Sequence, residues 1–379
     1  MQILLNLLAG VALLVWGTHL VRVAILRLYG GDLRRLLRRA VSRRPSAFFA
    51  GLGVTALIQS STATALIVAA FAGQGLISTA PALAVMLGAD VGTALVTIFL
   101  SLDLSWLSPL LIFSGVVLFL SRQETNVGRF GRILIGLGLI LFALQWISVS
   151  AKPLTEAAGM RVIFASLTGD ILLDMLVATF VTVLCFSSLA VVLLVATLAG
   201  LHVIALGVAM PLVLGANLGS GLLGMLSTLR SAPEARRVTL GNFLFKLIGC
   251  VVAIPLLRFV EPAIGGLGLA ENTEVVTFHL LFNIALAIIF LFATQSIARI
   301  AERLLPTRPD SEDPSKPRHL DPSALATPAL AIGCAAREAL RISDVIDEML
   351  QGVLTVLKTN DRTLAQKLRK LDDVVDELY

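Results

Sequence analysis

Long apolar runs dominate this chain and limit the folds open to it. They recur from Ile3 to Ile297 with few charged residues inside them, and each is close to the ~20 residues that a helix needs to cross the hydrocarbon core of a bilayer. Of the 379 residues, 57% are hydrophobic and 15% are charged, whereas soluble domains are about 45–50% apolar and about 25% charged. The runs lack the ~10-residue alternation of membrane barrels. The sequence therefore predicts an all-α polytopic membrane protein.

The basic residues predict how the chain threads the membrane. Full crossings are expected at 3–28, 75–100, 107–120, 131–150, 203–228, 239–258 and 274–297. Two further apolar stretches, 47–72 and 170–199, are interrupted by polar residues and are expected to be re-entrant hairpins. This threading puts the basic loops 29–46, 121–130 and 229–238 on one side, together with the C-terminal tail. By the positive-inside rule that side is the cytoplasm, and the expected location is the inner (plasma) membrane.

The basic segment near the N-terminus can be interpreted in two ways, and the apolar runs on both sides of it favour one of them. Residues 30–44 carry six arginines, and such a segment also suits nucleic acid. The apolar runs on both sides favour a cytoplasmic loop, so no nucleic-acid partner is expected. The first run is longer than a signal-peptide core and no small-residue cleavage site follows it, so it is expected to remain as the first helix.

The two interrupted stretches belong to an internal repeat. The serine pair Ser60–Ser61 matches Ser187–Ser188, and the glycine motif G-A-[D/N]-x-G-[T/S] at 88–93 matches that at 215–220. The difference in position is the same for both motifs (187 − 60 and 215 − 88), and we call it the repeat offset. With the threading above, the two repeats, about 47–120 and 170–258, would have inverted topology, because their hairpins enter from opposite sides.

The character of the chain changes after Arg303. Residues 305–328 are rich in proline, serine and charge, which is typical of a linker. From 329 to 379, apolar residues at spacings of three and four predict two amphipathic cytoplasmic helices joined by a turn at Thr359–Asp361. Two helices bury little surface, so this segment is expected to be truncated, or completed by a second copy or a helical partner. The transmembrane transport domain is expected to span 1–304.

The segment QSSTAT, residues 59–64, places five polar side chains inside an apolar run. A single serine in a membrane helix usually bonds to a carbonyl of its own helix or to a neighbouring helix. Five such side chains cannot all do so, and a buried glutamine without a partner is costly. A helix break at Ser60–Ser61 would instead expose amides and hydroxyls, which suit an anion, and carbonyls, which suit a small cation. Many secondary transporters build their sites from broken helices.

These motifs resemble those of the type II sodium–phosphate cotransporter family. GLGVTALIQSSTATALIV with MLGADVGTALVT is similar to its first repeat, and TVLCFSSLAVVLLV with VLGANLGSGL to its second. RRVTLGNFLFKLIG and EVVTFHLLFNIALAI resemble its two His-x-x-Phe-Asn helices. The C-terminal helices resemble the start of the PhoU-like domain of bacterial members. The resemblance implies sodium-coupled symport of inorganic phosphate by alternating access.

The resemblance also implies which residues hold the substrate and the ion. Phosphate would lie between the two serine-rich breaks, against Gln59, Ser60, Ser61, Thr62, Ser187 and Ser188. Sodium, as the coupling ion, would be bound by Thr64, Asp90, Thr93, Asn217 and Ser220. No other cofactor is expected. Neutral hydroxyls and amides suit an anion that must also leave, whereas several buried arginines would hold it too tightly.

Some positions depart from the family pattern. In the second repeat, Phe186 and Leu189 stand where a glutamine and a third hydroxyl residue are usual. Asp90 replaces an asparagine of the first glycine motif. In the first His-x-x-Phe-Asn helix, Asn242 and Lys246 replace the histidine and the asparagine. The second such helix keeps both as His279 and Asn283, which are accessory site candidates together with Lys246.

Asp90 and Lys246 are ionisable residues within apolar runs, which suggests a function. They pair with each other, or Lys246 contacts the anion, or Asp90 binds a cation or a proton. The alternative is that Lys246 only extends to the cytoplasmic interface along its apolar stem.

Three functions fit the sequence. The first is the sodium-coupled phosphate symporter. The losses in the second repeat leave open a divergent member with altered ion coupling, such as H⁺, or another oxyanion. The third is a membrane-anchored phosphate sensor or regulator that works through its helical tail. An enzyme is not expected, because the sequence shows no nucleophile–base pair, phosphate-binding loop or metal-ligand cluster, and Cys185, Cys250 and Cys334 lack metal or redox spacing.

Overall fold

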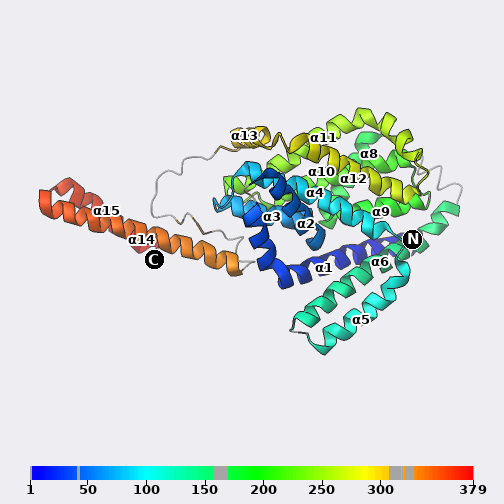
Figure 1. The fold of residues 1–379 in the computed structure, drawn as a ribbon, viewed down its shortest axis with the longest axis horizontal. Coiled ribbons are helices and arrows are strands. Elements are labelled where there is room, and N and C mark those ends of the chain that lie inside the picture. The colour runs from blue at the N-terminus through cyan, green and yellow to red at the C-terminus, as the bar shows by residue number, and fades with distance from the viewer. Residues whose placement is uncertain are drawn as a thin grey trace. The chain divides into compact units, whose positions relative to one another are not determined.

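The computed structural model describes residues 2–40, 43–123, 125–156, 170–306, 317, 319–320 and 328–378, and among these every regular element is a helix. In chain order the elements are α1 (Gln2–Ala40), α2 (Arg44–Ile58), α3 (Ser61–Gly73), α4 (Thr79–Ser101), the 3-10 helix η1 (Ser105–Leu107), α5 (Ser108–Ser121), α6 (Asn126–Glu156), α8 (Ile171–Cys185), α9 (Ser188–Gly200), α10 (Leu206–Ser227), α11 (Pro233–Gly265), α12 (Glu271–Phe290), α13 (Thr294–Leu304), α14 (Pro328–Thr359) and α15 (Arg362–Leu378) (Figure 1). The all-α prediction is confirmed.

The chain divides into two compact units. The first comprises Met1–Arg230 and Glu234–Leu304, and the second comprises Ser231–Pro233 and Leu305–Tyr379. Most of the predicted linker, 305–328, lies outside the described residues. The first unit contains the apolar helices and the candidate site, and the second contains α14 and α15.

Six of the described helices are long and apolar enough to cross a membrane: α1, α4, α6, α10, α11 and α12. Two expected crossings differ from the structure. The crossing expected at 107–120 is the 14-residue helix α5, which rises only about 21 Å and is shorter than a ~30 Å hydrocarbon core. The crossing expected at 274–297 corresponds to α12 but ends earlier than predicted, because α12 ends at Phe290 and a separate amphipathic helix, α13, begins at Thr294.

Each interrupted stretch forms two helices with a short break between them. The backbone turns left-handed at Gln59 (φ 58°, ψ 29°) and in the same way at Phe186 (φ 51°, ψ 25°). The next residue, Ser60 or Ser187, is extended and caps the following helix, and its hydroxyl accepts a hydrogen bond from the amide three residues on, at 3.2 Å in both cases. Serine is among the preferred N-cap residues. The first break therefore lies at Gln59–Ser60, one position before the predicted one.

The glycine motifs let the first arm of each broken pair approach a long helix closely. A Cβ at Gly88 of α4 would lie 1.9 Å from the Phe48 carbonyl oxygen of α2, and a Cβ at Gly215 of α10 would lie 2.2 Å from the Met175 oxygen of α8. Phe48 and Met175 are themselves separated by the repeat offset (175 − 48), so the sequence repeat also relates these tertiary contacts. The membrane face from which each broken pair enters stays a prediction.

The second arms connect the two halves. Helix α3 contacts both α4 and α10, and helix α9 likewise contacts both α10 and α4. Helix α12 packs against α4, α9 and α10. The breaks are therefore surrounded by long helices from both halves.

In the second unit, α14 and α15 pack against each other as a helical pair. The predicted turn is confirmed: Asn360 adopts a left-handed φ of 52°, and the Asp361 carboxylate accepts hydrogen bonds from the Thr363 amide at 2.8 Å and the Leu364 amide at 3.2 Å. The pKa of Asp361 lies below its ordinary value, because the Thr363 hydroxyl and these amides stabilise the carboxylate. Among the described residues, nothing covers one face of α14, where Leu354 and Leu357 are 59% and 77% exposed.

We predict that Gly88→Ala lowers the free energy of unfolding in detergent by about 3 kcal/mol, because the added methyl group would overlap the Phe48 carbonyl oxygen. The matched control is Gly53→Ala on α2, where an added Cβ meets nothing within 4 Å. The control should be neutral or stabilise the helix by about 0.5–1 kcal/mol. Equal stability of the two variants in denaturant unfolding would contradict the close backbone contact.

Candidate functional site

The two helix breaks meet at one small cavity. Its volume is about 10 Å³, and it is lined by Gln59, Ser60, Ser61, Thr62, Thr93, Phe186, Ser187, Ser188 and Leu189. The structure thus brings together all six residues predicted to bind phosphate. Helices α3 and α9 both begin at this cavity, and helix N-termini present free amides and a positive dipole end. No lysine or arginine is among the described residues that line it.

The polar groups of the cavity come unequally from the two halves. Ser60, Ser61, Ser187 and Ser188 are all buried, with at most 9% of each residue exposed. The side-chain carbonyl oxygen of Gln59 is buried and has no hydrogen-bond partner in the described structure. Phe186, at the matching position of the second break, is 64% exposed. The first break therefore supplies a polar side chain where the second supplies a ring.

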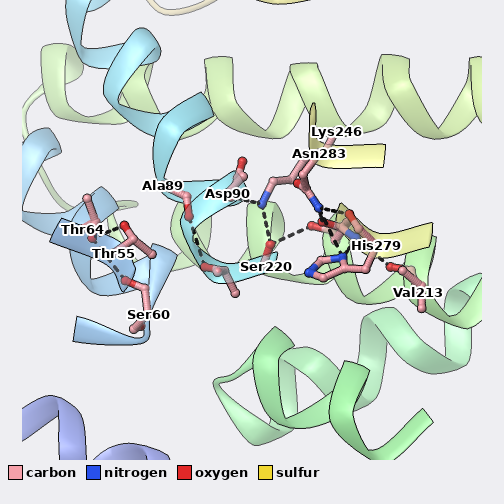
Figure 2. Close-up of polar contacts among 12 residues, drawn as sticks. Thr55, Ser60, Thr64, Ala89, Asp90, Val213, Ser220, Lys246, His279 and Asn283 are labelled. Carbon is pink, nitrogen blue, oxygen red and sulfur yellow. Dashed lines mark hydrogen bonds and ion pairs between the residues drawn. The ribbon is translucent and has the colours of Figure 1, made fainter. Parts of the chain in front are cut away.

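The threonines around the first break have two different environments. Thr93 of α4 lines the cavity, and its hydroxyl donates to the Ala89 carbonyl at 3.2 Å. Thr64, which was also predicted to bind sodium, does not line the cavity. Its hydroxyl lies 2.7 Å from that of Thr55 (Figure 2), so it joins α3 to α2.

Thr182, the counterpart of Thr55, has a buried hydroxyl with no partner among the described residues. The reason is visible in the sequence, because Val191 stands at the position of the second repeat that corresponds to Thr64, and valine has no hydroxyl.

A buried polar cluster lies beside the second glycine motif. Asn217 of α10 has its Nδ2 3.0 Å from His279 Nδ1 of α12, and its Oδ1 accepts from Asn283 Nδ2 at 3.2 Å. The three residues are at most 3% exposed. Asn283 Oδ1 and His279 Nε2 are buried without hydrogen-bond partners in the described structure. The side-chain hydrogen bonds of Asn217, a predicted sodium-binding residue, are with α12 and its own helix.

The first glycine motif is tied to α11 by a buried ion pair. The Lys246 ammonium donates to Asp90 Oδ1 at 2.8 Å and to Ser220 Oγ at 2.6 Å (Figure 2). The Lys246 and Asp90 side chains are 2% and 6% exposed. The alternative that Lys246 extends to the interface is therefore wrong, and the pairing alternative is correct. Two residues predicted to bind sodium, Asp90 and Ser220, both contact this ammonium group.

Sequence reasoning had one signal for this pair. Asp90 and Lys246 were the two charged departures from the family pattern and carry opposite charges. Their separation of 156 residues meant that only the packing of α11 against α4 and α10 could show that they touch. Asn242, one turn before Lys246, has a buried Oδ1 without a partner in the described structure, and nothing in the sequence indicated that.

A helical membrane protein whose broken helices meet in a polar, uncharged cavity has the architecture of a secondary transporter. The chain matches the family model described as Na+/Pi-cotransporter over residues 13–149 and that of the PhoU domain over residues 339–379. Together with the relatives below, these matches show that the chain belongs to the Na+/Pi-cotransporter family, as the sequence motifs predicted. They point to a phosphate-transport protein rather than an enzyme.

The chain is 48% identical over all 379 residues to the "Putative inorganic phosphate export protein YjbB" of Escherichia coli (strain K12), and covers 70% of that protein. The protein of the same name from Salmonella typhimurium is equally similar, with 48% identity and 70% coverage. The chain is also 23% identical over 308 residues, 81% of its own length, to the "Uncharacterized protein YqeW" of Bacillus subtilis, which it covers completely. No solved structure matches the chain.

We predict that Asp90→Asn and Lys246→Met each lower the free energy of unfolding by about 3–5 kcal/mol, since each leaves one buried charge unpaired. The double variant should return to within about 1 kcal/mol of the wild type, because it removes both charges. Denaturant unfolding in detergent measures the three variants.

The matched control for this pair is Asp32→Asn. It breaks the ion pair with Arg35, in which the Arg35 and Asp32 side chains are 72% and 63% exposed, and should cost less than about 1 kcal/mol. If the free energy of unfolding of the double variant falls by the sum of the two single changes, Asp90 and Lys246 do not depend on each other.

Proposed function

We propose that this protein carries inorganic phosphate across the membrane by alternating access, with phosphate held between the two helix breaks. The observation that supports this most directly is the convergence of both serine pairs on one cavity. The residues concerned come from two separate repeats of the chain, and a purely structural role would not require the two pairs to face each other.

The chemistry of the cavity suits an oxyanion that is bound and then released. Phosphate oxygens accept hydrogen bonds, and serine and threonine hydroxyls, the glutamine amide and the free amides at two helix N-termini all donate them. These donors are neutral, and hydrogen bonds to a charged partner contribute roughly 1.5–3 kcal/mol each. A few such bonds give affinity without the tighter charge-assisted pairing that arginine would supply.

Sodium is the proposed coupling ion. The hydrogen bonds of the candidate residues indicate which side-chain oxygen atoms are free to bind it. Asp90 and Thr64 already have side-chain partners. Asn283 has a side-chain carbonyl oxygen without a partner in the described structure and contacts Asn217. Neutral oxygens of this kind suit a small hard cation. The cluster of Asn217 and Asn283 is therefore our preferred sodium site, with Thr93 as a further candidate at the cavity.

The direction of transport depends on the gradients, and the name of the Escherichia coli relative favours export. Coupling to H⁺, or transport of another oxyanion, is the alternative within the same mechanism. The PhoU match at 339–379 favours an added regulatory role for the tail. We place the protein in the inner membrane with this tail in the cytoplasm, where the uncovered face of α14 would bind a second copy or a helical partner.

We predict that purified protein in liposomes takes up ³²P-phosphate, and faster with an inward sodium gradient than without one. Ser60→Ala and Ser187→Ala should each lower the apparent affinity for phosphate in this assay by roughly 10- to 100-fold, because each removes one hydrogen bond to a charged ligand. The uptake assay is run at several phosphate concentrations, so that affinity and maximal rate are separated.

The matched control is Ser114→Ala on α5, whose hydroxyl bonds to carbonyls of its own helix. It should transport like the wild type. Full activity of both site variants would overturn the phosphate site. Uptake that responds to pH and not to sodium would show that H⁺ is the coupling ion. No uptake with any cation would favour the sensor function.

A further inference from the structure

Lys246 lies where the two halves of the protein meet. Its helix, α11, belongs to neither glycine motif, but its ammonium contacts both of them: Asp90 of the first motif at 2.8 Å and Ser220 of the second at 2.6 Å. The residue is 1% exposed. A carboxylate and a hydroxyl from two different helices thus surround a single positive charge.

The second half provides an internal comparison. Asn217 is the counterpart of Asp90 at the repeat offset (217 − 90). The side-chain oxygen of Asn217 accepts from Asn283 at 3.2 Å, whereas that of Asp90 accepts from Lys246 at 2.8 Å. Both partners follow the same spacing, as the last residue of N-F-L-F-K and of H-L-L-F-N. One half therefore has a neutral pair, and the other has an acid and a base.

The neutral pair leaves an amide oxygen without a partner among the described residues, whereas in the charged pair the Lys246 ammonium contacts Asp90 Oδ1. Asn283 Oδ1 is buried without a partner in the described structure, so this half can accept a cation from solution. In the other half the Asp90 carboxylate and the Ser220 hydroxyl already surround an ammonium. An ammonium and a sodium ion carry the same charge and are both bound by oxygen atoms. The ammonium differs because it is covalently attached and cannot leave during the transport cycle.

We propose that Lys246 is a built-in cation that fills, between Asp90 and Ser220, the position that a sodium ion would otherwise occupy. Coupling to sodium is then left to the half that contains Asn217. The consequence for transport rests on the proposed function, whereas the binding of a cation at this position can be tested without transport.

The first test removes the ammonium and offers sodium in its place. Thermal unfolding of Lys246→Ala is measured in detergent, in NaCl and in choline chloride at equal ionic strength. We expect NaCl to raise the Tm of this variant by about 5 °C more than that of the wild type, because sodium binds the folded state at the vacated position. The same response in both salts would overturn the proposal.

Two further variants serve as controls for this test. Asp90→Asn combined with Lys246→Ala removes the carboxylate as well, so the additional response to sodium should disappear. Lys367→Ala removes an exposed lysine of α15 and should respond to NaCl as the wild type does. An additional sodium response of the Asp90→Asn, Lys246→Ala variant would overturn the assignment, because this variant has neither the carboxylate nor an amide oxygen at position 246.

A second test covers the case in which Lys246→Ala does not fold. Asp90→Asn with Lys246→Asn makes this half neutral, like the Asn217–Asn283 pair. Phosphate uptake in liposomes should then depend more steeply on sodium, with a Hill coefficient higher by about one than that of the wild type. An unchanged steepness would overturn the proposal.

The two hypotheses fail in different ways. If the wild type moves no phosphate with any cation, the proposed function is wrong, and the unfolding experiment still decides what Lys246 does. If the wild type transports phosphate and neither Lys246→Ala nor Asp90→Asn with Lys246→Asn gains a sodium response, the proposed function stands and the built-in cation is wrong.

Discussion

The close backbone contact between each broken helix pair and a long helix is the constraint on which the rest of this structure depends. It is possible only because Gly88 and Gly215 lack side chains where α2 and α8 cross α4 and α10. This contact fixes how far each arm reaches before it breaks. The breaks at Gln59 and Phe186 then fall at the same place, although each belongs to a separate segment of the chain. Without this contact, the packing of the helices would not bring the two serine pairs to one cavity.

Inside an apolar environment, every polar group needs a partner or a ligand. Most polar side chains near the site are satisfied locally: Ser60 and Ser187 cap helices, and Thr64 binds Thr55. Two of the exceptions are informative because they lie at the first break and on α12. Gln59 Oε1 and Asn283 Oδ1 are both buried without partners in the described structure. A protein that binds and releases an anion and a cation needs such unpaired groups, at some cost in stability.

The two halves have the same backbone plan and different chemistry. The first half has the glutamine, the paired threonines and the ion pair, and the second has the exposed ring of Phe186 and the neutral Asn217–Asn283 contact. In a symmetric transporter both halves would contribute equally to substrate and ion. Here the first half offers most of the side-chain donors at the cavity, and its Asp90 is paired with Lys246 of α11. The Asn217–Asn283 contact is the position that we propose for a mobile cation. Under the proposed function, this division would explain how a site with only one complete half couples phosphate to an ion.

The sequence by itself determined the helical membrane fold, the positions of both breaks to within one position, and the family, because apolar run length and repeated motifs are local properties. It placed the end of the crossing at 274–297 too late, since the short amphipathic helix α13 begins soon after α12 and continues the apolar run. Only the tertiary structure decided what Asp90 and Lys246 do. Their pairing depends on α11 packing against two other helices, and no local pattern specifies which buried charges, 156 residues apart, will neutralise each other.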